Sequence, residues 1–375
     1  MRKAVYILIT LSLVLLMTGL LALPDAVDKS AYAEPEKLAP ASCPIISSSS
    51  AFDGLFVNTS SSDIYGHSPI FLQKQPFLEY AELIDFENIE ENLRVFTEEI
   101  GPRQLGSRGN LSARRYIVSE LESLGFSESA GTLARQGFYA LSTYTENILA
   151  VIPSEIENAP ILLFGAHFDS VSGTQGAVDN ASGATSLLAI IRAIIKSGHK
   201  YEFELRFCFF SAEENGYYGA YRYLNLQNNE AISRHTAFIN IDMSGYELCD
   251  AEKAIVISTK GSPNGSSPAE PNIISFSAES AYQNFYIGEH KLFCPEKIGK
   301  HDIVPFYRRS IPCATFSWRE IDPPRAVDNN LGIAPPHYMH TRNDNFENID
   351  VGSVYIMTQF IIVTFCSIAD HLSVV

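Results

Sequence analysis

Residues 161–169 read Ile-Leu-Leu-Phe-Gly-Ala-His-Phe-Asp, an apolar run that ends in an imidazole and a carboxylate. A continuous apolar run of this length is typical of a strand buried on both faces of a parallel sheet. The run therefore predicts that His167 lies at the carboxyl end of a buried strand, with Asp169 two positions further on. Asp169 could then hydrogen-bond the imidazole from behind, as a ligating histidine requires. The alternative is a histidine whose hydrogen bonds are satisfied within a loop.

Strands and helices are predicted to alternate on both sides of this run. This alternation favours an α/β fold, in which a mostly parallel central sheet is covered by helices on both faces in a single three-layer domain over residues 81–375. Helices are expected from Phe86 up to Gly101-Pro102 and over residues 112–124, 182–196, 217–226, 273–285 and 351–369. Strands are expected over residues 147–152, 161–166, 203–210, 237–241, 254–258 and 314–317.

The first 33 residues have the pattern of a signal peptide. Arg2 and Lys3 precede an apolar stretch, and Ala31-Tyr32-Ala33 is a small-x-small cleavage sequence. We expect cleavage and a secreted or extracytoplasmic protein. Because the apolar stretch is nearly long enough to span a bilayer, an uncleaved N-terminal membrane anchor is the competing interpretation. Residues 34–80 contain serine runs and prolines and are interpreted as a linker or pro-segment.

Composition excludes some classes of partner. The chain has 375 residues and a net charge of −16, so no nucleic-acid partner is expected, because phosphate binding requires a basic face. Six cysteines occur without CxxC spacing, which argues against a structural zinc site or a redox pair built from thiols. Cys208 and Cys366 lie in apolar stretches and are expected to be buried, whereas Cys249 and Cys294 could pair.

Further acidic and imidazole residues follow the other predicted strands. Asp179 precedes a helix, where a helix cap is the simpler explanation. Glu213-Glu214 follows a strongly apolar strand, where two carboxylates are costly unless a cation lies nearby. Asp242 ends the next strand, and His340 lies in a loop before the last helix. Taken alone, each of these two residues is more simply explained as structural than as functional.

Taken together, these residues predict a metal centre. Imidazole and carboxylate suit zinc and its divalent neighbours, and the carboxyl ends of strands meet at one crevice of an α/β sheet. His167, Asp179 and Asp242 could hold one ion, and Asp179, Glu214 and His340 a second. Three carboxylates and one bridging hydroxide would balance the four positive charges. Glu213 would remain to take a proton from the nucleophilic water.

The motifs resemble the co-catalytic, two-zinc aminopeptidase family of metallopeptidases, which also includes glutamate carboxypeptidases and glutaminyl cyclases. The resemblance covers roughly residues 85–370 and rests on His167-x-Asp169, Asp179-Asn180-x-Ser182-Gly183, Glu213-Glu214-x-Gly216, Asn240-x-Asp242-Met243 and His340-Thr341, with Gly101-Pro102-Arg103 upstream.

This resemblance implies a mixed sheet with helices on both faces and a cis peptide at Asp179-Asn180. It also implies site roles: five zinc ligands bind two Zn²⁺ per chain, Glu213 is the general base and Asp169 orients His167. Co²⁺ or Mn²⁺ remain possible. The zinc ligands are His167, Asp179, Glu214, Asp242 and His340.

One segment departs from the family pattern. Where the family often has Ser-Asp-His, this chain has the stretch Lys300-His301-Asp302-Ile303, in which Asp302 can align but Ile303 falls where histidine is common, so that His301 is displaced. His301 is therefore not assigned to a metal, and the departure puts substrate specificity in doubt.

The expected function is an exported aminopeptidase that acts on peptides or small proteins through a zinc-bound hydroxide. The alternatives are a glutaminyl cyclase or carboxypeptidase on the same scaffold, or a non-catalytic binding domain. The sequence does not indicate the oligomeric state.

Overall fold

The apolar run at 161–167 forms strand β3 (Ile161–His167), every residue of which is buried. The computed structural model describes residues 75–249, 251–259, 273–284, 290–294, 301–321 and 333–373, all of them within one compact unit. The predicted signal peptide and most of the 34–80 segment lie outside these residues, so both remain predictions. A short helix, α2 (Gln75–Glu82), spans the predicted boundary at residue 81.

The main sheet is mixed, as the resemblance implied. Its strand order is β1-β2-β4-β3-β5-β9-β7-β8, and β10 pairs with β9. The central strands β4, β3, β5 and β9 are parallel, whereas β1–β2, β2–β4, β7–β9 and β9–β10 pair antiparallel. The strands are β1 (Leu133–Ala140), β2 (Thr143–Ile152), β4 (Glu204–Phe210), β5 (His235–Ile241), β7 (Lys253–Thr259), β8 (Lys291–Phe293), β9 (Cys313–Ile321) and β10 (Ile333–Ala334); β6 (Tyr246–Glu247) and β11 (Ile349–Asp350) form a separate pair.

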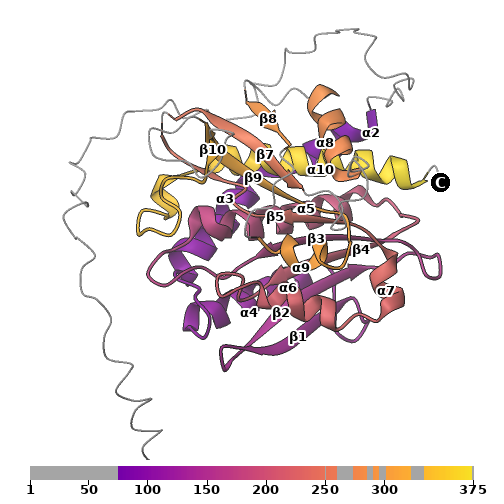
Figure 1. The fold of residues 1–375 in the computed structure, drawn as a ribbon, viewed down its shortest axis with the longest axis horizontal. Coiled ribbons are helices and arrows are strands. Elements are labelled where there is room, and N and C mark those ends of the chain that lie inside the picture. Colours follow the sequence, from indigo (N-terminus) through magenta and orange to yellow (C-terminus); the bar gives the residue numbers. More distant parts are fainter. Residues whose placement is uncertain are drawn as a thin grey trace, which may run out of the picture. The chain divides into compact units, whose positions relative to one another are not determined.

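Helices cover both faces of the sheet, so the predicted α/β class is confirmed (Figure 1). Helices α2, α8 and α10 lie side by side on one face, with α5 and α3 next to them, whereas α6 and α9 pack on the other. The helices are α3 (Phe86–Arg94) continued by η2 (Val95–Ile100), α4 (Arg108–Ser123), η3 (Ala177–Ala181), α5 (Ser182–Ser197), α6 (Tyr218–Asn225), α7 (Asn229–Arg234), α8 (Ile273–Asn284), α9 (Ile303–Tyr307), η4 (Phe346–Asn348) and α10 (Val351–Ser373).

The boundaries differ from the predictions at a few elements. Helix α4 begins at Arg108 rather than near residue 112, because the side chain of Ser107 accepts a hydrogen bond from Asn110 N and caps the helix. Strand β9 extends to Ile321, beyond the predicted end at 317. Strand β1 was not predicted at all.

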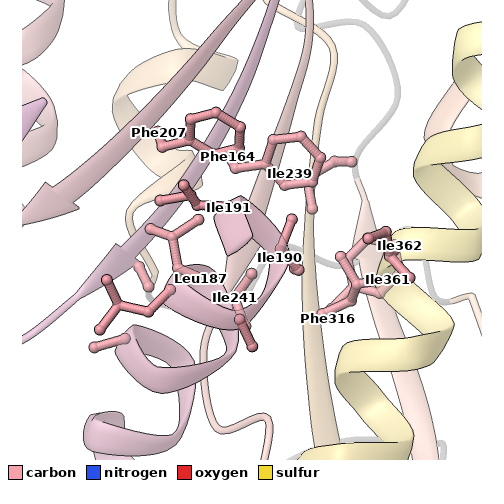
Figure 2. Close-up of a cluster of buried hydrophobic side chains, with 14 of the residues drawn as sticks. Phe164, Leu187, Ile190, Ile191, Phe207, Ile239, Ile241, Phe316, Ile361 and Ile362 are labelled. Atoms are coloured by element: carbon pink, nitrogen blue, oxygen red, sulfur yellow. The ribbon is translucent and has the colours of Figure 1, made fainter. Parts of the chain in front are cut away.

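The two faces of the sheet bury separate hydrophobic cores. Along β3, Leu162 and Phe164 contribute to the larger core, and Leu163 contributes to the smaller one. Figure 2 shows the larger core, where α5 and α10 pack against side chains of the central strands. A Cβ at Gly165 would lie 2.4 Å from the ring of Phe210. The aromatic packing of the smaller core therefore requires glycine at this position of β3.

Two described helical segments, 177–197 and 351–372, are long and apolar enough to cross a membrane. Of the most apolar window in each, 89% and 72% is buried inside the protein, which is what core helices of an α/β domain require. Cys208 and Cys366 are buried, as predicted. The possible pairing of Cys249 with Cys294 is wrong, because both are free thiols.

Candidate metal centre

The candidate ligands converge at the carboxyl ends of the central strands. His167 is the last residue of β3, Asp242 directly follows β5, and Glu214 follows β4 in the loop before α6. Strand β4 lies on one side of β3 and β5 lies on the other, so the direction in which successive strands are added to the sheet reverses at β3. Such a switch point is where α/β sheets form their ligand-binding crevice. Asp179 lies in η3, directly before α5, and His340 lies in the loop before α10.

The five predicted ligands form two adjoining groups that share Asp179. In the first, His167 Nε2 lies 3.2 Å from Asp179 Oδ1 and 3.5 Å from Asp242 Oδ1. In the second, His340 Nε2 lies 3.0 Å from Asp179 Oδ2 and 3.2 Å from Glu214 Oε2. The two oxygens of Asp179 therefore face different imidazoles, which is the arrangement that a bridging carboxylate requires.

Three buried polar atoms in these groups point to ions as their missing partners. His167 Nε2, Asp242 Oδ1 and Glu214 Oε1 have no hydrogen-bond partner. Leaving such atoms unsatisfied inside a protein costs about 1–3 kcal/mol each. In both groups the ligand atoms lie within 4.8 Å of one another. Nitrogen and carboxylate oxygen donors in this number fit two divalent ions, with zinc the best match to the donor set.

Asp169 organises the site from behind His167. Its main-chain oxygen lies 3.2 Å from His167 Nδ1, and its carboxylate Oδ1 lies 3.7 Å from the same nitrogen. The contact with the imidazole is thus made chiefly by the backbone, whereas the sequence suggested the side chain. The carboxylate instead accepts hydrogen bonds from the backbone N–H groups of Glu213 and Glu214. Asp169 therefore fixes the turn that carries both glutamates.

Glu213 is buried beside the ion-binding groups but belongs to neither. None of the described residues hydrogen-bonds to its carboxylate, which leaves that group able to accept a proton. Burial raises the pKa of Glu213 well above its usual value, and the nearby carboxylates of Asp302 and Asp242 add to this effect. A carboxyl group with a raised pKa next to ion ligands is typical of a general base.

The candidate ligands shift one another's pKa values because they lie so close together. Hydrogen bonds to Asp179 and Glu214 raise the pKa of His340 to about 10. Burial, together with the charge of Asp179, raises the pKa of Glu214 to about 7. The pKa of Asp242 is lowered despite its burial, because His301 and His167 lie next to it. A metal ion bound here would therefore compete with protons for the same nitrogen and oxygen atoms.

Asn180 and Gly183 connect Asp179 to Asp242. The amide nitrogen of Asn180 donates to Ile241 O at 2.9 Å, and its oxygen accepts from Met243 N at 3.1 Å. Asn180 thus clamps the residues on both sides of Asp242. A Cβ at Gly183 would lie 2.5 Å from Ile241 O, so only glycine lets the start of α5 approach this strand end. The close approach explains the Asn180-x-Ser182-Gly183 part of the motif.

Three further buried side chains hold the loops of the site. Asp344 accepts from Val178 N and Asp179 N at 2.6 and 3.2 Å, and Glu247 accepts from His337 N and Tyr338 N in the loop that carries His340. Arg103, fully buried, donates to five main-chain oxygens, which belong to Phe96, Gly101, Phe168, Gln175 and Gly176. Asp344 and Glu247 were not identified from the sequence, because single acidic residues in loops carry no local pattern.

Three residues among or directly beside the candidate ligands have a strained backbone. Ala212, Met243 and His340 have φ values of 61°, 60° and 63°, in the left-handed region that non-glycine residues rarely adopt. Ala212 directly precedes Glu213, and Met243 directly follows Asp242. Such residues cluster where a site requires an unusual backbone direction. The Asp179–Asn180 peptide bond is cis, as the resemblance implied.

Comparison with known proteins identifies the family. Residues 147–365, more than half of the chain, match the sequence profile of Peptidase family M28. The chain belongs to peptidase family M28. Among curated relatives of this M28 chain, aminopeptidase YwaD of Bacillus subtilis is 30% identical over 209 residues, and leupeptin-inactivating enzyme 1 of Streptomyces exfoliatus is 27% identical over 222 residues. These matches cover 55% and 56% of this chain and 40% and 43% of those relatives.

Solved structures agree with the M28 fold. A zinc aminopeptidase from Bacillus subtilis superimposes with a TM-score of 0.64 at 16% identity, covering 75% of this chain and 94% of the other. A glutaminyl cyclase from Macrostomum lignano gives a TM-score of 0.62 at 18% identity, covering 83% and 98%. At these identities the similarity concerns the fold alone. The predicted family and sheet architecture are therefore both confirmed.

Proposed function

We propose that this M28 chain is a zinc-dependent aminopeptidase, which removes residues from the amino terminus of peptides with two Zn²⁺ held by the metal centre. The observation that carries the proposal is Asp179, whose two carboxylate oxygens face two separate ligand groups 3.0–3.2 Å from their imidazoles. The curated relatives with aminopeptidase names support the reaction class. The chain spans less than half the length of those relatives, so substrate and activity are part of the proposal.

The residues divide the chemistry between them. His167, Asp179 and Asp242 would hold one ion, and Asp179, Glu214 and His340 the other. When bound, the ions would supply Lewis-acid chemistry, polarising a peptide carbonyl and lowering the pKa of a nearby water. Glu213 accepts a proton from the attacking water at its carboxylate oxygen and then delivers it to the amine that leaves. Asp169 keeps Glu213 in place through the backbone hydrogen bond at 3.2 Å.

Export belongs to this proposal as well. The basic start, the apolar stretch and the Ala31-Tyr32-Ala33 sequence favour a cleaved signal peptide. Amino-terminal sequencing of the protein recovered from its host would test this. A mature chain that begins after Ala33 supports export, and a chain that begins at Met1 in a membrane fraction supports the anchor.

The test of the activity combines metal content with a substrate panel. We expect elemental analysis to give two zinc ions per chain, and aminoacyl anilides to be hydrolysed while blocked dipeptides are not. Cleavage of blocked dipeptides only would identify a carboxypeptidase. Cyclisation of amino-terminal glutaminyl peptides, with one ion per chain, would identify a glutaminyl cyclase. Tight metal binding without turnover of any of these substrates would favour a non-catalytic binding domain.

A further inference from the structure

The two carboxylate oxygens of Asp242 lie in different surroundings. Oδ2 lies 2.5 Å from His301 Nδ1, whereas Oδ1 faces His167 Nε2 at 3.5 Å and has no hydrogen-bond partner. Asp242 is 3% exposed, so solvent does not compensate for the difference. One oxygen is therefore held by a protein side chain, and the other is directed at the first ion-binding group.

His301 is itself held by the partly buried guanidinium group of Arg319. Its Nε2 lies 3.1 Å from Arg319 Nη2, and the other terminal nitrogen of Arg319 lies 3.5 Å from Met243 Sδ. A guanidinium can only donate hydrogen bonds, so His301 Nε2 must be the acceptor. His301 Nδ1 then carries the hydrogen and donates it to Asp242 Oδ2. The contacts form a directed chain from Arg319 through His301 to Asp242.

The same geometry excludes His301 as a metal ligand in this arrangement. A ligating histidine offers a ring nitrogen lone pair. In His301, one nitrogen is the donor to Asp242 and the lone pair of the other accepts from Arg319, so neither is free. His301 occupies the segment in which the sequence departs from the Ser-Asp-His pattern of the family, and the structure gives that departure a physical role.

The chain of contacts joins three elements at the carboxyl edge of the sheet. Asp242 follows β5, Arg319 lies on the neighbouring strand β9, and His301 directly precedes the turn into α9. The backbone around them is fixed, since Asp242 N donates to Phe316 O at 3.1 Å and Val304 N donates to His301 O at 3.0 Å. The backbone at Asp242 and at His301 is thus anchored independently of any ion.

We propose that His301 and Arg319 are positioning residues that reserve Oδ1 of Asp242 for the ion bound with His167 and Asp179. This inference rests on the proposed two-ion function. Without the donor from His301, the Asp242 carboxylate can rotate and its buried charge loses a partner. The ion at the His167–Asp179–Asp242 group should then bind more weakly, whereas the ion at the Asp179–Glu214–His340 group keeps its ligands. Partners that hold ligating carboxylates typically change metal affinity by about 10–100-fold.

The experiment titrates the metal-free full-length chain with Zn²⁺ against a competing chelator and repeats the titration with Co²⁺, whose visible absorption reports coordination. The variants are His301→Leu, which removes the donor; His301→Asn, whose amide can donate from a similar place; and Arg319→Met, which removes the group that fixes the histidine tautomer. His235→Leu is the matched control, because His235 is another buried histidine, with Tyr223 and Ala231 as its partners outside the site.

We expect two Zn²⁺ to bind to the unmodified chain. His301→Leu should lose about 10–100-fold in affinity for one ion only, with one component of the Co²⁺ spectrum altered, and His301→Asn should recover most of the loss. Arg319→Met should weaken the same ion, which keeps the test available if His301→Leu does not fold. Unchanged affinity for both ions in folded His301→Leu and Arg319→Met would overturn the proposal, as would an equal loss of both ions.

These outcomes are separate from those of the proposed function. A chain that binds two ions and shows the selective loss, yet hydrolyses no aminoacyl substrate, would contradict the aminopeptidase activity and support the positioning role. A chain that cleaves aminoacyl substrates while His301→Leu and Arg319→Met keep both ions would support the activity and overturn the positioning role.

Discussion

At the scale of single residues, the site separates candidate ion ligands from groups that position other groups. Asp179 is the candidate ligand with the clearest geometry, because each of its oxygens faces a different imidazole. Asp169 directs, because its carboxylate accepts the N–H groups of Glu213 and Glu214. The carboxylate of Glu213, in contrast to its backbone N–H, has no hydrogen-bond partner among the described residues. Substitution of a candidate ligand should therefore remove bound metal, whereas substitution of Glu213 should remove turnover and leave the metal in place.

Glu213→Gln should keep both ions and lose turnover. Glutamine has nearly the same shape but cannot accept the proton of the attacking water, and general bases contribute about 10²–10⁴-fold to rate. Steady-state kinetics on an aminoacyl anilide, with elemental analysis of the same sample, measures both properties. Glu230→Gln on α7 serves as the control and should behave like the unmodified chain. Retained activity in Glu213→Gln would remove that residue from the role of base.

Asp179→Ala should lose both ions, because its carboxylate belongs to both ligand groups. His340→Ala, in contrast, should weaken only the ion that it shares with Glu214. Elemental analysis after dialysis against zinc distinguishes the two results. Two ions still bound to Asp179→Ala would contradict the bridging role.

At the scale of elements, the approach of α5 to the end of β5 determines whether the ligands meet. In Gly183→Ala, the added methyl carbon would lie 2.5 Å from Ile241 O and 2.3 Å from the side-chain oxygen of Asn180, which is closer than van der Waals contact allows. We expect the free energy of unfolding to fall by about 1–3 kcal/mol, with zinc stoichiometry reduced because Asp242 moves away from Asp179. Chemical denaturation and metal analysis measure these effects.

Gly352→Ala is the matched control for this substitution. It also lies near the start of a helix, but its added Cβ would meet only the flexible side chain of Asp350, at 3.1 Å. The control should keep its stability and its full zinc content. Equal behaviour of the two variants would show that the close approach at Gly183 is unimportant.

At the scale of the whole molecule, bound zinc should stabilise the fold, because the ligands meet only when the sheet is assembled. His167 and His340 lie more than 170 residues apart in sequence, so the unfolded chain has no preformed site. Binding to the native state alone adds about 4 kcal/mol when free zinc is 1,000 times its dissociation constant. Thermal unfolding with zinc and with chelator should differ accordingly, and Asp179→Ala should show no such difference. An identical midpoint with zinc and with chelator in the unmodified chain would contradict ion binding at this site.

Stability should also fall in mild acid because of His235. Burial lowers its pKa to about 4, even though hydrogen bonds to Ala231 O and from the Tyr223 hydroxyl satisfy both ring nitrogens. In the unfolded chain the imidazole of His235 takes up a proton near pH 6.5, whereas in the folded chain it stays neutral down to about pH 4. The contribution of His235 to the free energy of unfolding is therefore complete above pH 6.5 and is lost progressively as pH falls toward 4.

Between pH 7 and pH 5 the unmodified chain should therefore lose about 2 kcal/mol more than His235→Gln does. Denaturant unfolding of the metal-free proteins at both pH values measures the difference, with exposed His199→Gln as the control. Parallel losses in the unmodified chain and His235→Gln would show that His235 does not carry this pH dependence.

Strong periodic patterns made much of this molecule predictable. The apolar run ending at His167 identified β3, and the ordered acidic motifs identified the candidate ligands that the structure brings together. Strand β1 (Leu133–Ala140) was not predicted, because it lies at the edge of the sheet and its sequence mixes polar and apolar residues without a continuous apolar run. Its hairpin turn also uses Leu141 and Ser142 at positive φ, without the usual Gly or Asn.

The α/β class, the family and the types of candidate ligand could be predicted without coordinates, because burial periodicity and short motifs are properties of local sequence. Three features became visible only in the folded chain: His301 and Arg319 support Asp242, Asp344 and Glu247 hold the loops, and the main chain of Asp169 contacts His167. These contacts join residues from separate strands and loops. Their partners are fixed by how the sheet brings strand ends together, which no local pattern encodes.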